Sequence, residues 1–177
     1  MSATVNKTKL TLVAKYFVYG ILLTLLYVLQ TTPGLFVVFG TKPMLVVPAA
    51  IAIAMHEGEF AGGWYGAFAG LLCDIGSSML FGFNGFLFTF FCVGAGLLVT
   101  HLMHCNFWNA MLFTLVTMMA VGSLEFLFGY GMWGLDSVWM IYVHRTLPLI
   151  AYTTFVAPLL FWLVRKIHRK VQRMITN

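Results

Sequence analysis

Basic side chains are concentrated at the two ends of this 177-residue chain, and the long stretch between them is largely apolar. The basic residues flank the apolar stretch, with two exceptions inside it: Lys7, Lys9 and Lys15 precede it, Lys42 and Arg145 interrupt it, and Arg165, Lys166, Arg169, Lys170 and Arg173 follow it. Only 8% of the residues are charged and 61% are hydrophobic, so most of the surface cannot face water. The chain is therefore predicted to be an all-α, polytopic membrane protein with one transmembrane domain over residues 1–177.

Turn signals divide the apolar stretch into six candidate transmembrane helices, since about 20 residues cross the hydrocarbon core. The expected spans are residues 16–30, 44–55, 58–80, 86–103, 108–130 and 137–164. Basic residues that flank membrane spans stay in the cytoplasm. Both termini are therefore predicted to be cytoplasmic, as a short segment over residues 1–15 and a basic tail over residues 165–177.

The net charge of +5 comes from these flanking positions, so no nucleic-acid partner is predicted. The tail cations instead predict attraction to anionic lipids of the inner leaflet, worth about 1 kcal/mol per basic residue near the surface. An acidic cytosolic partner is the alternative. The residues concerned are Arg165, Lys166, Arg169, Lys170 and Arg173.

Small residues recur at every fourth position of the third candidate span, where Gly58, Gly62, Gly66 and Gly70 are followed by Asp74 and Ser78. This spacing lets helix backbones approach closely, which drives helix association in lipid. Each step of four residues advances about 400°, so the ridge drifts around the helix and its members need not meet the same neighbour. Part of the ladder is therefore expected to pack inside the chain, and the remainder could receive a transmembrane helix of a partner.

Three charged residues within the spans are predicted to lie at similar depths, roughly 9–12 Å below the outer ends of their helices. They are Asp74, Glu125 and Arg145. Isolated charges at that depth are costly, so a buried polar cluster is expected. The cluster is either a packing clamp or a site for a proton or solute.

A cytoplasmic hinge is expected between the second and third spans, at His56, Glu57 and Glu59. Acidic residues at a helix start complement the helix dipole. A role in contacting a partner is the alternative for these carboxylates.

No metal site, cofactor or catalytic residue is predicted. His101, His104 and Cys105, with Cys92 further back, carry ligand-type side chains, but their spacing matches no zinc pattern. The sequence contains no phosphate-binding loop and no HExxH motif. A non-enzymatic protein is therefore expected.

Read in order, the motifs resemble the rod shape-determining protein MreD family, most clearly over residues 25–100. The resemblance is carried by Leu29-Gln30, Gly40-x-x-Pro43, Glu57-Gly58, Gly62, Gly66, Gly70-Leu71-Leu72-x-Asp74 and Gly82-Phe83-Asn84-Gly85. Met44 departs from the pattern, because relatives often carry an acid after the proline.

The resemblance implies a scaffold of the bacterial cell-elongation complex in the inner membrane. Its implied partners are the bitopic protein MreC and, through it, MreB filaments, the RodA glycosyltransferase and a class B penicillin-binding protein. The resemblance also implies a fold like the six-helix S-components of energy-coupling-factor transporters. The alternative function is therefore that of an S-component, which binds a vitamin or a metal.

Overall fold

The computed structural model describes residues 2–32, 42–77, 81–129 and 146–176, with side-chain surroundings for the parts of these ranges between residues 13 and 172. These residues form helices and connecting turns, with no strand among them. The helices are α1 (Ser2–Thr31), α2 (Val46–Glu57), α3 (Glu59–Ile75), α4 (Phe83–His101), α5 (Phe107–Gly129) and α7 (Leu147–Thr176).

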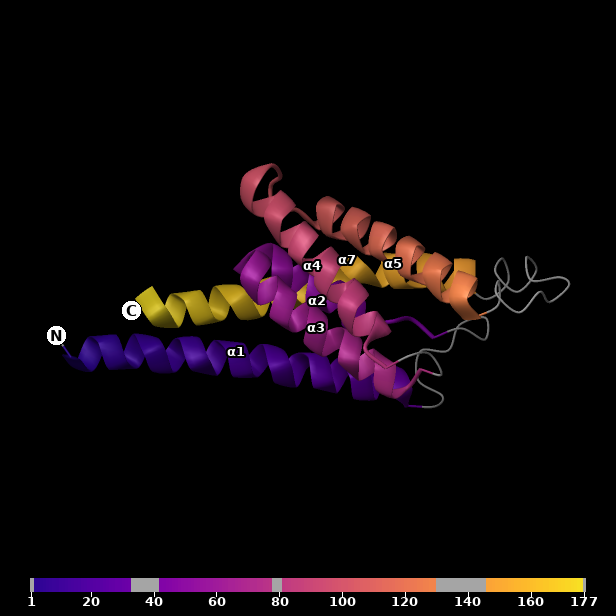
Figure 1. The fold of residues 1–177 in the computed structure, drawn as a ribbon. Helices are drawn as coiled ribbons and strands as arrows, with labels where there is room; N and C mark the ends of the chain where they lie inside the picture. Colours follow the sequence, from indigo (N-terminus) through magenta and orange to yellow (C-terminus); the bar gives the residue numbers. More distant parts are fainter. Residues whose placement is uncertain (1, 33–41, 78–80, 130–145, 177) are drawn as a thin grey trace, which may run out of the picture.

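Four segments of the described helices are long and apolar enough to cross a membrane: Val13–Thr31, Phe83–His101, Phe107–Phe128 and Leu147–Gln172. The prediction of an all-helical fold is confirmed for the described residues, and the four apolar segments agree with the prediction of a membrane protein. Both chain ends lie at the same end of the elongated bundle, where α1 and α7 extend beyond the other helices (Figure 1). We refer to this end of the bundle as the termini end.

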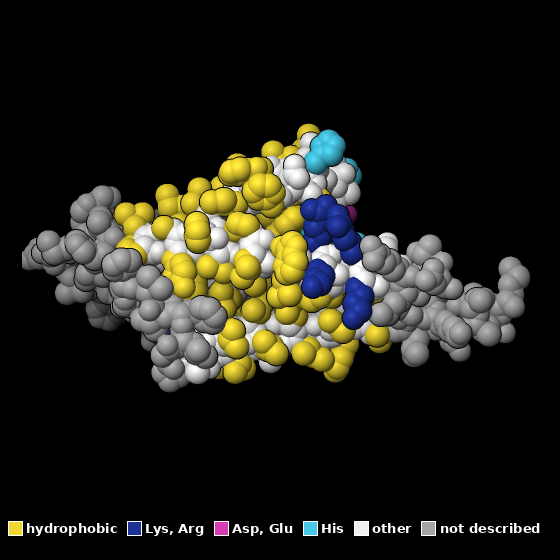
Figure 2. Space-filling view, turned by 180° about the vertical axis from the view of Figure 1, so that it is seen from behind, with side chains coloured by type: hydrophobic (Ala, Val, Ile, Leu, Met, Phe, Trp, Pro, Cys, Tyr) yellow, Lys and Arg dark blue, Asp and Glu magenta, His cyan; other side chains and the backbone are white. Residues whose placement is uncertain are grey.

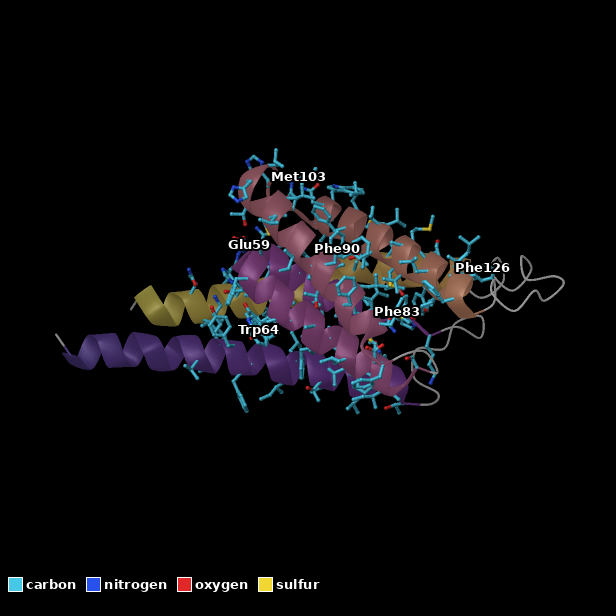
Figure 3. The ribbon with its side chains drawn as sticks, viewed as in Figure 1. Glu59, Trp64, Phe83, Phe90, Met103 and Phe126 are labelled. Carbon is cyan, nitrogen blue, oxygen red and sulfur yellow. The ribbon has the colours of Figure 1, made fainter. Side chains whose placement is uncertain are left out.

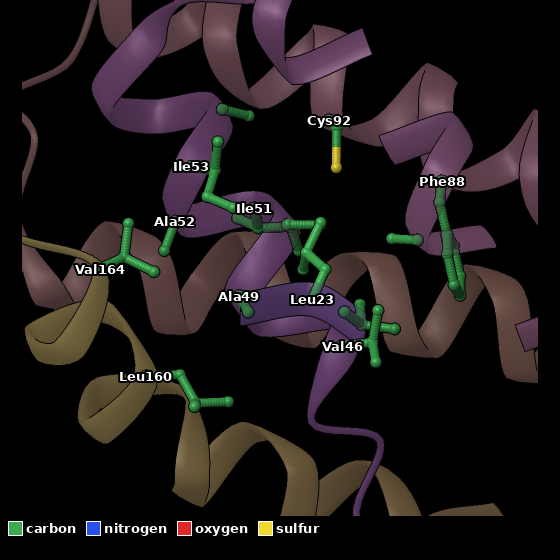
Figure 4. Packing of buried hydrophobic residues seen from close by; sticks show 14 of the residues in the cluster. Leu23, Val46, Ala49, Ile51, Ala52, Ile53, Phe88, Cys92, Leu160 and Val164 are labelled. Carbon is green, nitrogen blue, oxygen red and sulfur yellow. The ribbon is translucent and has the colours of Figure 1, made fainter. Parts of the chain in front are cut away.

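Helix α2 is the core of the bundle rather than a peripheral short span. All ten residues Val46–Met55 are buried, and α1, α3, α4, α5 and α7 all contact the helix. Its alanines at positions 49, 50, 52 and 54 keep it thin, so neighbouring helices approach closely. Figure 4 shows Ile51 and Ile53 of α2 in the same cluster as Leu23 of α1 and Leu160 of α7. Because protein surrounds α2, its 12 residues do not have to span the lipid by themselves.

The helix limits differ from those predicted in three informative places. The second helix begins at Val46, three residues after Pro43, and Pro48 occupies its first turn, where no intrahelical N–H bond is required. Helix α3 ends at Ile75 instead of continuing to residue 80. The last helix extends to Thr176, beyond the predicted end at residue 164. Its predicted start at residue 137 lies outside the described residues.

The fourth helix was expected to begin at residue 86, after a turn at residues 82–85, but α4 already begins at Phe83. Gly82 alone adopts the left-handed conformation, with φ of 95°. The first turn of α4 is stabilised by a side chain from another helix, which sequence spacing does not reveal. That side chain is Asp74, described below.

Candidate functional site

The glycine ladder of α3 faces α4 and α2 inside the chain. A Cβ atom on Gly62 would lie 2.6 Å from Ala54 Cβ of α2, and one on Gly66 would lie 2.7 Å from the Phe88 carbonyl oxygen of α4. One on Gly70 would lie 2.5 Å from Gly85 Cα. Real Cβ atoms do not approach other atoms so closely, so these positions require glycine at the existing helix separation. The ladder between Gly62 and Gly70 is used within the chain.

The two end positions of the ladder do not share the close helix packing of Gly62, Gly66 and Gly70. Gly58 separates α2 from α3 with φ of 88°, a conformation that glycine adopts readily. It is a hinge rather than a packing residue of α3. A Cβ atom on Gly96 of α4 would lie 2.8 Å from Glu59 Cα, so α4 contributes a small residue at this end instead. Ser78 lies outside the described residues.

The Asp74 carboxylate caps the N-terminus of α4. It accepts hydrogen bonds from the backbone N–H groups of Gly82 at 2.9 Å, Asn84 at 3.1 Å and Gly85 at 3.2 Å. A helix N-terminus presents unpaired N–H groups and a positive dipole end, and a carboxylate satisfies both. Asp74 therefore joins the end of α3 to the start of α4, and the ladder continues this contact along the same two helices.

Asn84 extends the polar contact from Asp74 to α5. Its side chain and that of Asp74 both interact electrostatically with the Glu125 carboxyl group of α5. The buried Asn84 Oδ1 atom has no hydrogen-bond partner among the described residues. Of the predicted cluster, Asp74 and Glu125 are thus brought together, with Asn84 between them. Arg145 lies outside the described residues.

A second polar cluster lies near the termini end and was not predicted as a group. Glu57, at the end of α2, accepts a hydrogen bond from Lys15 Nζ at 2.7 Å and forms an ion pair with it at 2.6 Å. The Tyr19 hydroxyl donates to the same carboxylate at 2.9 Å, and His168 Nδ1 lies 2.7 Å from it. We call Lys15, Tyr19, Glu57 and His168 the Glu57 cluster.

The Glu57 cluster corrects the expectation for Glu57. Glu57 was predicted to cap a helix or contact a partner, yet its carboxylate is buried and connects α1, α2 and α7. Lys15, the last residue of the expected cytoplasmic segment, is buried at 4% exposure and pairs with the same carboxylate. The available sequence signal was the i, i+4 spacing of Lys15 and Tyr19, which places both side chains on one face of α1. Nothing in the sequence pairs that face with Glu57.

His56 and Cys105 lie beside this cluster. The His56 ring lies 5.3 Å from the His168 ring, and Cys105 Sγ is 3.8 Å from His56 Nε2. Burial raises the pKa of the Cys105 thiol, which lies between α4 and α5, and the nearby Arg165 charge opposes this in part. The Cys105 thiol and the His56 imidazole thus contact each other beside the Glu57 cluster.

The remaining residues with ligand-type side chains do not lie together in a cluster. His101 and His104 are exposed, and Cys92 is buried against the glycine face of α3. Within the described ranges, no group of three or more His, Cys, Asp or Glu side chains is arranged to hold a metal ion. Glu59 is partly exposed at the start of α3, near the termini end in Figure 3, with Phe126 at the opposite end.

The outer surface has two contrasting regions. Large apolar side chains of α3 point away from its glycine face: Phe60 is 81% exposed, Trp64 69% and Ile75 67%. On the face shown in Figure 2, an apolar belt ends at a patch of lysine and arginine side chains toward the termini end. Four tail residues are exposed there on α7: Arg165, Lys166, Arg169 and Lys170. The side-chain surroundings of Arg173 are not described.

Comparisons of the chain with protein-family models, with curated proteins and with solved structures gave no match.

Proposed function

We propose that this protein is a non-enzymatic scaffold of the bacterial cell-elongation complex, as its resemblance to MreD implies. It would reside in the inner membrane with six crossings and cytoplasmic termini. It would bind MreC and thereby connect MreB filaments with RodA and a class B penicillin-binding protein. The location of both termini at one end of the bundle agrees with an even number of crossings.

Support comes from the structural role of the residues that carry the resemblance. Gln30 Oε1 accepts a hydrogen bond from the Val46 N–H at the start of α2, at 3.3 Å. The glycines of α3 contact α2 and α4, and Asp74 caps α4. The shared motif therefore specifies contacts between helices. A motif of this kind suits a protein whose role is to maintain a shape that others bind.

The observation that carries the proposal is the division of α3 into two faces. Its small-residue face packs against α2 and α4 inside the chain. The other face carries an exposed apolar stripe whose mean spacing is close to the helical repeat, formed by Phe60, Trp64, Phe68, Leu71 and Ile75. In lipid, helices associate through van der Waals packing, to which a row of large side chains on a firmly held helix contributes. We assign this stripe, instead of the glycine ladder, as the face that receives the transmembrane helix of MreC.

Photo-crosslinking tests this assignment. A photoreactive amino acid replaces Trp64 or Phe68 on the stripe, or Phe155 on α7, which is also exposed and serves as the matched control. We expect crosslinking to MreC from positions 64 and 68 and much less from position 155. Equal yields from all three positions, or no MreC adduct from the stripe, would contradict the proposal. Recovery of ATP-binding cassette subunits would favour the S-component function instead.

A further inference from the structure

The C-terminal helix α7 continues past the apolar belt while one side of it stays attached to the bundle. Val164 is fully buried, Ile167 packs against the core, and His168 contacts the Glu57 carboxylate. These three contacts fix the rotation of α7 about its own axis over this segment. The opposite side of the helix is therefore presented in one orientation.

That opposite side carries Arg165, Lys166, Arg169 and Lys170, all of which are exposed. At about 100° per residue, these four positions fall within roughly 140° of the helix circumference. They form one continuous face, which we call the basic face of α7 and which matches the dark blue patch in Figure 2. The helical repeat thus places the four cations on one side of α7, and the contacts of Val164, Ile167 and His168 on the other side fix its orientation.

The depth of the basic face is set by Trp162. Its side chain is 59% exposed, and Lys166 Nζ lies 5.0 Å from the centre of its ring. Exposed tryptophan at the end of a membrane span typically sits at the level of the lipid headgroups. The four cations follow within about 5–12 Å along the helix axis, and the headgroup layer is about 5–8 Å thick on each side, so their long side chains reach its phosphates.

The basic face has no carboxylate partner within the described residues. Glu57 lies nearby, but it is occupied by Lys15 and His168. The ion pairs found among the described residues involve only that carboxylate. Arginine and lysine side chains left unpaired at headgroup depth are suited to phosphate oxygens.

We propose that the basic face of α7 is a binding site for the phosphate headgroups of anionic phospholipids in the leaflet at the termini end. A cytosolic acidic protein fits less well, because the site begins directly at the edge of the apolar belt. The acyl chains of a bound lipid would lie along the exposed apolar side chains of α7, including Leu159 and Trp162. This inference does not depend on which protein partner the scaffold binds.

Lipid-dependent thermal stability tests the site. The full chain in a neutral detergent is titrated with phosphatidylglycerol or with phosphatidylcholine of the same acyl chains, and unfolding is followed on heating. We expect phosphatidylglycerol to raise the melting temperature, and the R165Q/K166Q/R169Q/K170Q variant to need on the order of several hundredfold more of it, as four contributions of about 1 kcal/mol give when they add. The single variant K166Q is expected to weaken the response about fivefold.

Lys42 provides the matched control, since it lies near the opposite end of α1 and donates to the carbonyl groups of Thr31 and Thr32. K42Q should respond to phosphatidylglycerol as the unmodified protein does. Equal stabilisation by phosphatidylcholine, or an unchanged response in the quadruple variant, would overturn the proposal. Displacement of the lipid by free glycerol phosphate at equal concentration would identify a site for soluble phosphate instead. If the quadruple variant fails to fold, K166Q and K170Q tested singly decide the question.

Discussion

Lys15 of α1 and Glu57 of α2 form a buried ion pair with an N–O distance of 2.6 Å, although 42 positions separate them in the chain. The pair lies where the apolar bundle ends and the helix extensions begin. Tyr19 of α1 and His168 of α7 also contact this carboxylate, so side chains of α1, α2 and α7 interact at Glu57. The cluster fixes α1, whose contacts with the bundle are otherwise sparse, relative to α2 and α7.

Removing the charge of Glu57 should destabilise the protein strongly. In Glu57→Gln, Lys15 would remain buried without its counter-ion, a situation that typically costs about 3–5 kcal/mol. We expect a clearly lower melting temperature in detergent. Glu59→Gln is the control, because Glu59 is partly exposed and forms no ion pair among the described residues. Equal melting temperatures for the two variants would show that the buried pair does not hold the helices together.

The Tyr19 hydroxyl should contribute a smaller, separable amount. Tyr19→Phe keeps the buried ring and removes only one donor to Glu57, so a loss of about 1 kcal/mol is expected. Tyr16→Phe removes a hydroxyl from a more exposed position on the same helix and should leave stability unchanged. The two variants are compared by thermal unfolding under identical conditions. A larger loss in Tyr16→Phe than in Tyr19→Phe would contradict the assignment.

Adding a single methyl group to the ladder should force α3 and α4 apart. A Cβ atom on Gly66 would meet the backbone of Phe88, which cannot move independently, so Gly66→Ala is expected to cost about 1–3 kcal/mol. Gly94→Ala on α4 is the matched control, because nothing lies within 4 Å of a Cβ atom there. The yield of monodisperse protein and the melting temperature measure the effect. Similar values for both variants would rule out close packing at Gly66.

Asp74 should be needed for the helical start of α4. Asp74→Ala leaves three backbone N–H groups without their acceptor, at a cost of about 1–3 kcal/mol. Asp74→Asn retains one acceptor oxygen and should lose less. Amide hydrogen exchange over residues 82–86 reports the change directly. Unaltered protection in Asp74→Ala would mean that this carboxylate does not stabilise the helix terminus.

Several features of the fold were accessible from the sequence because they depend on local patterns. Apolar runs bounded by Gly, Pro and polar residues predicted the helices. For five of the six described helices, the first residue, the last residue or both lie within a few residues of the predicted position. The i, i+4 spacing of Gly62, Gly66 and Gly70 predicted a close helix contact, although not whether it lay within the chain. Charge placement at the chain ends indicated a membrane protein, because the low-charge middle cannot be solvated.

Tertiary structure alone decided which groups meet. Asp74 was matched by depth with Glu125 and Arg145, yet its oxygens are used by the backbone of α4, and no spacing rule connects residue 74 with residues 82–85. The central position of α2 was also hidden, since a short apolar segment looks the same whether it faces lipid or protein. Sequence periodicity defines the faces of each helix. The pairing of faces depends on how all the helices pack together, and that packing buries Lys15 against Glu57 while leaving the basic face of α7 exposed.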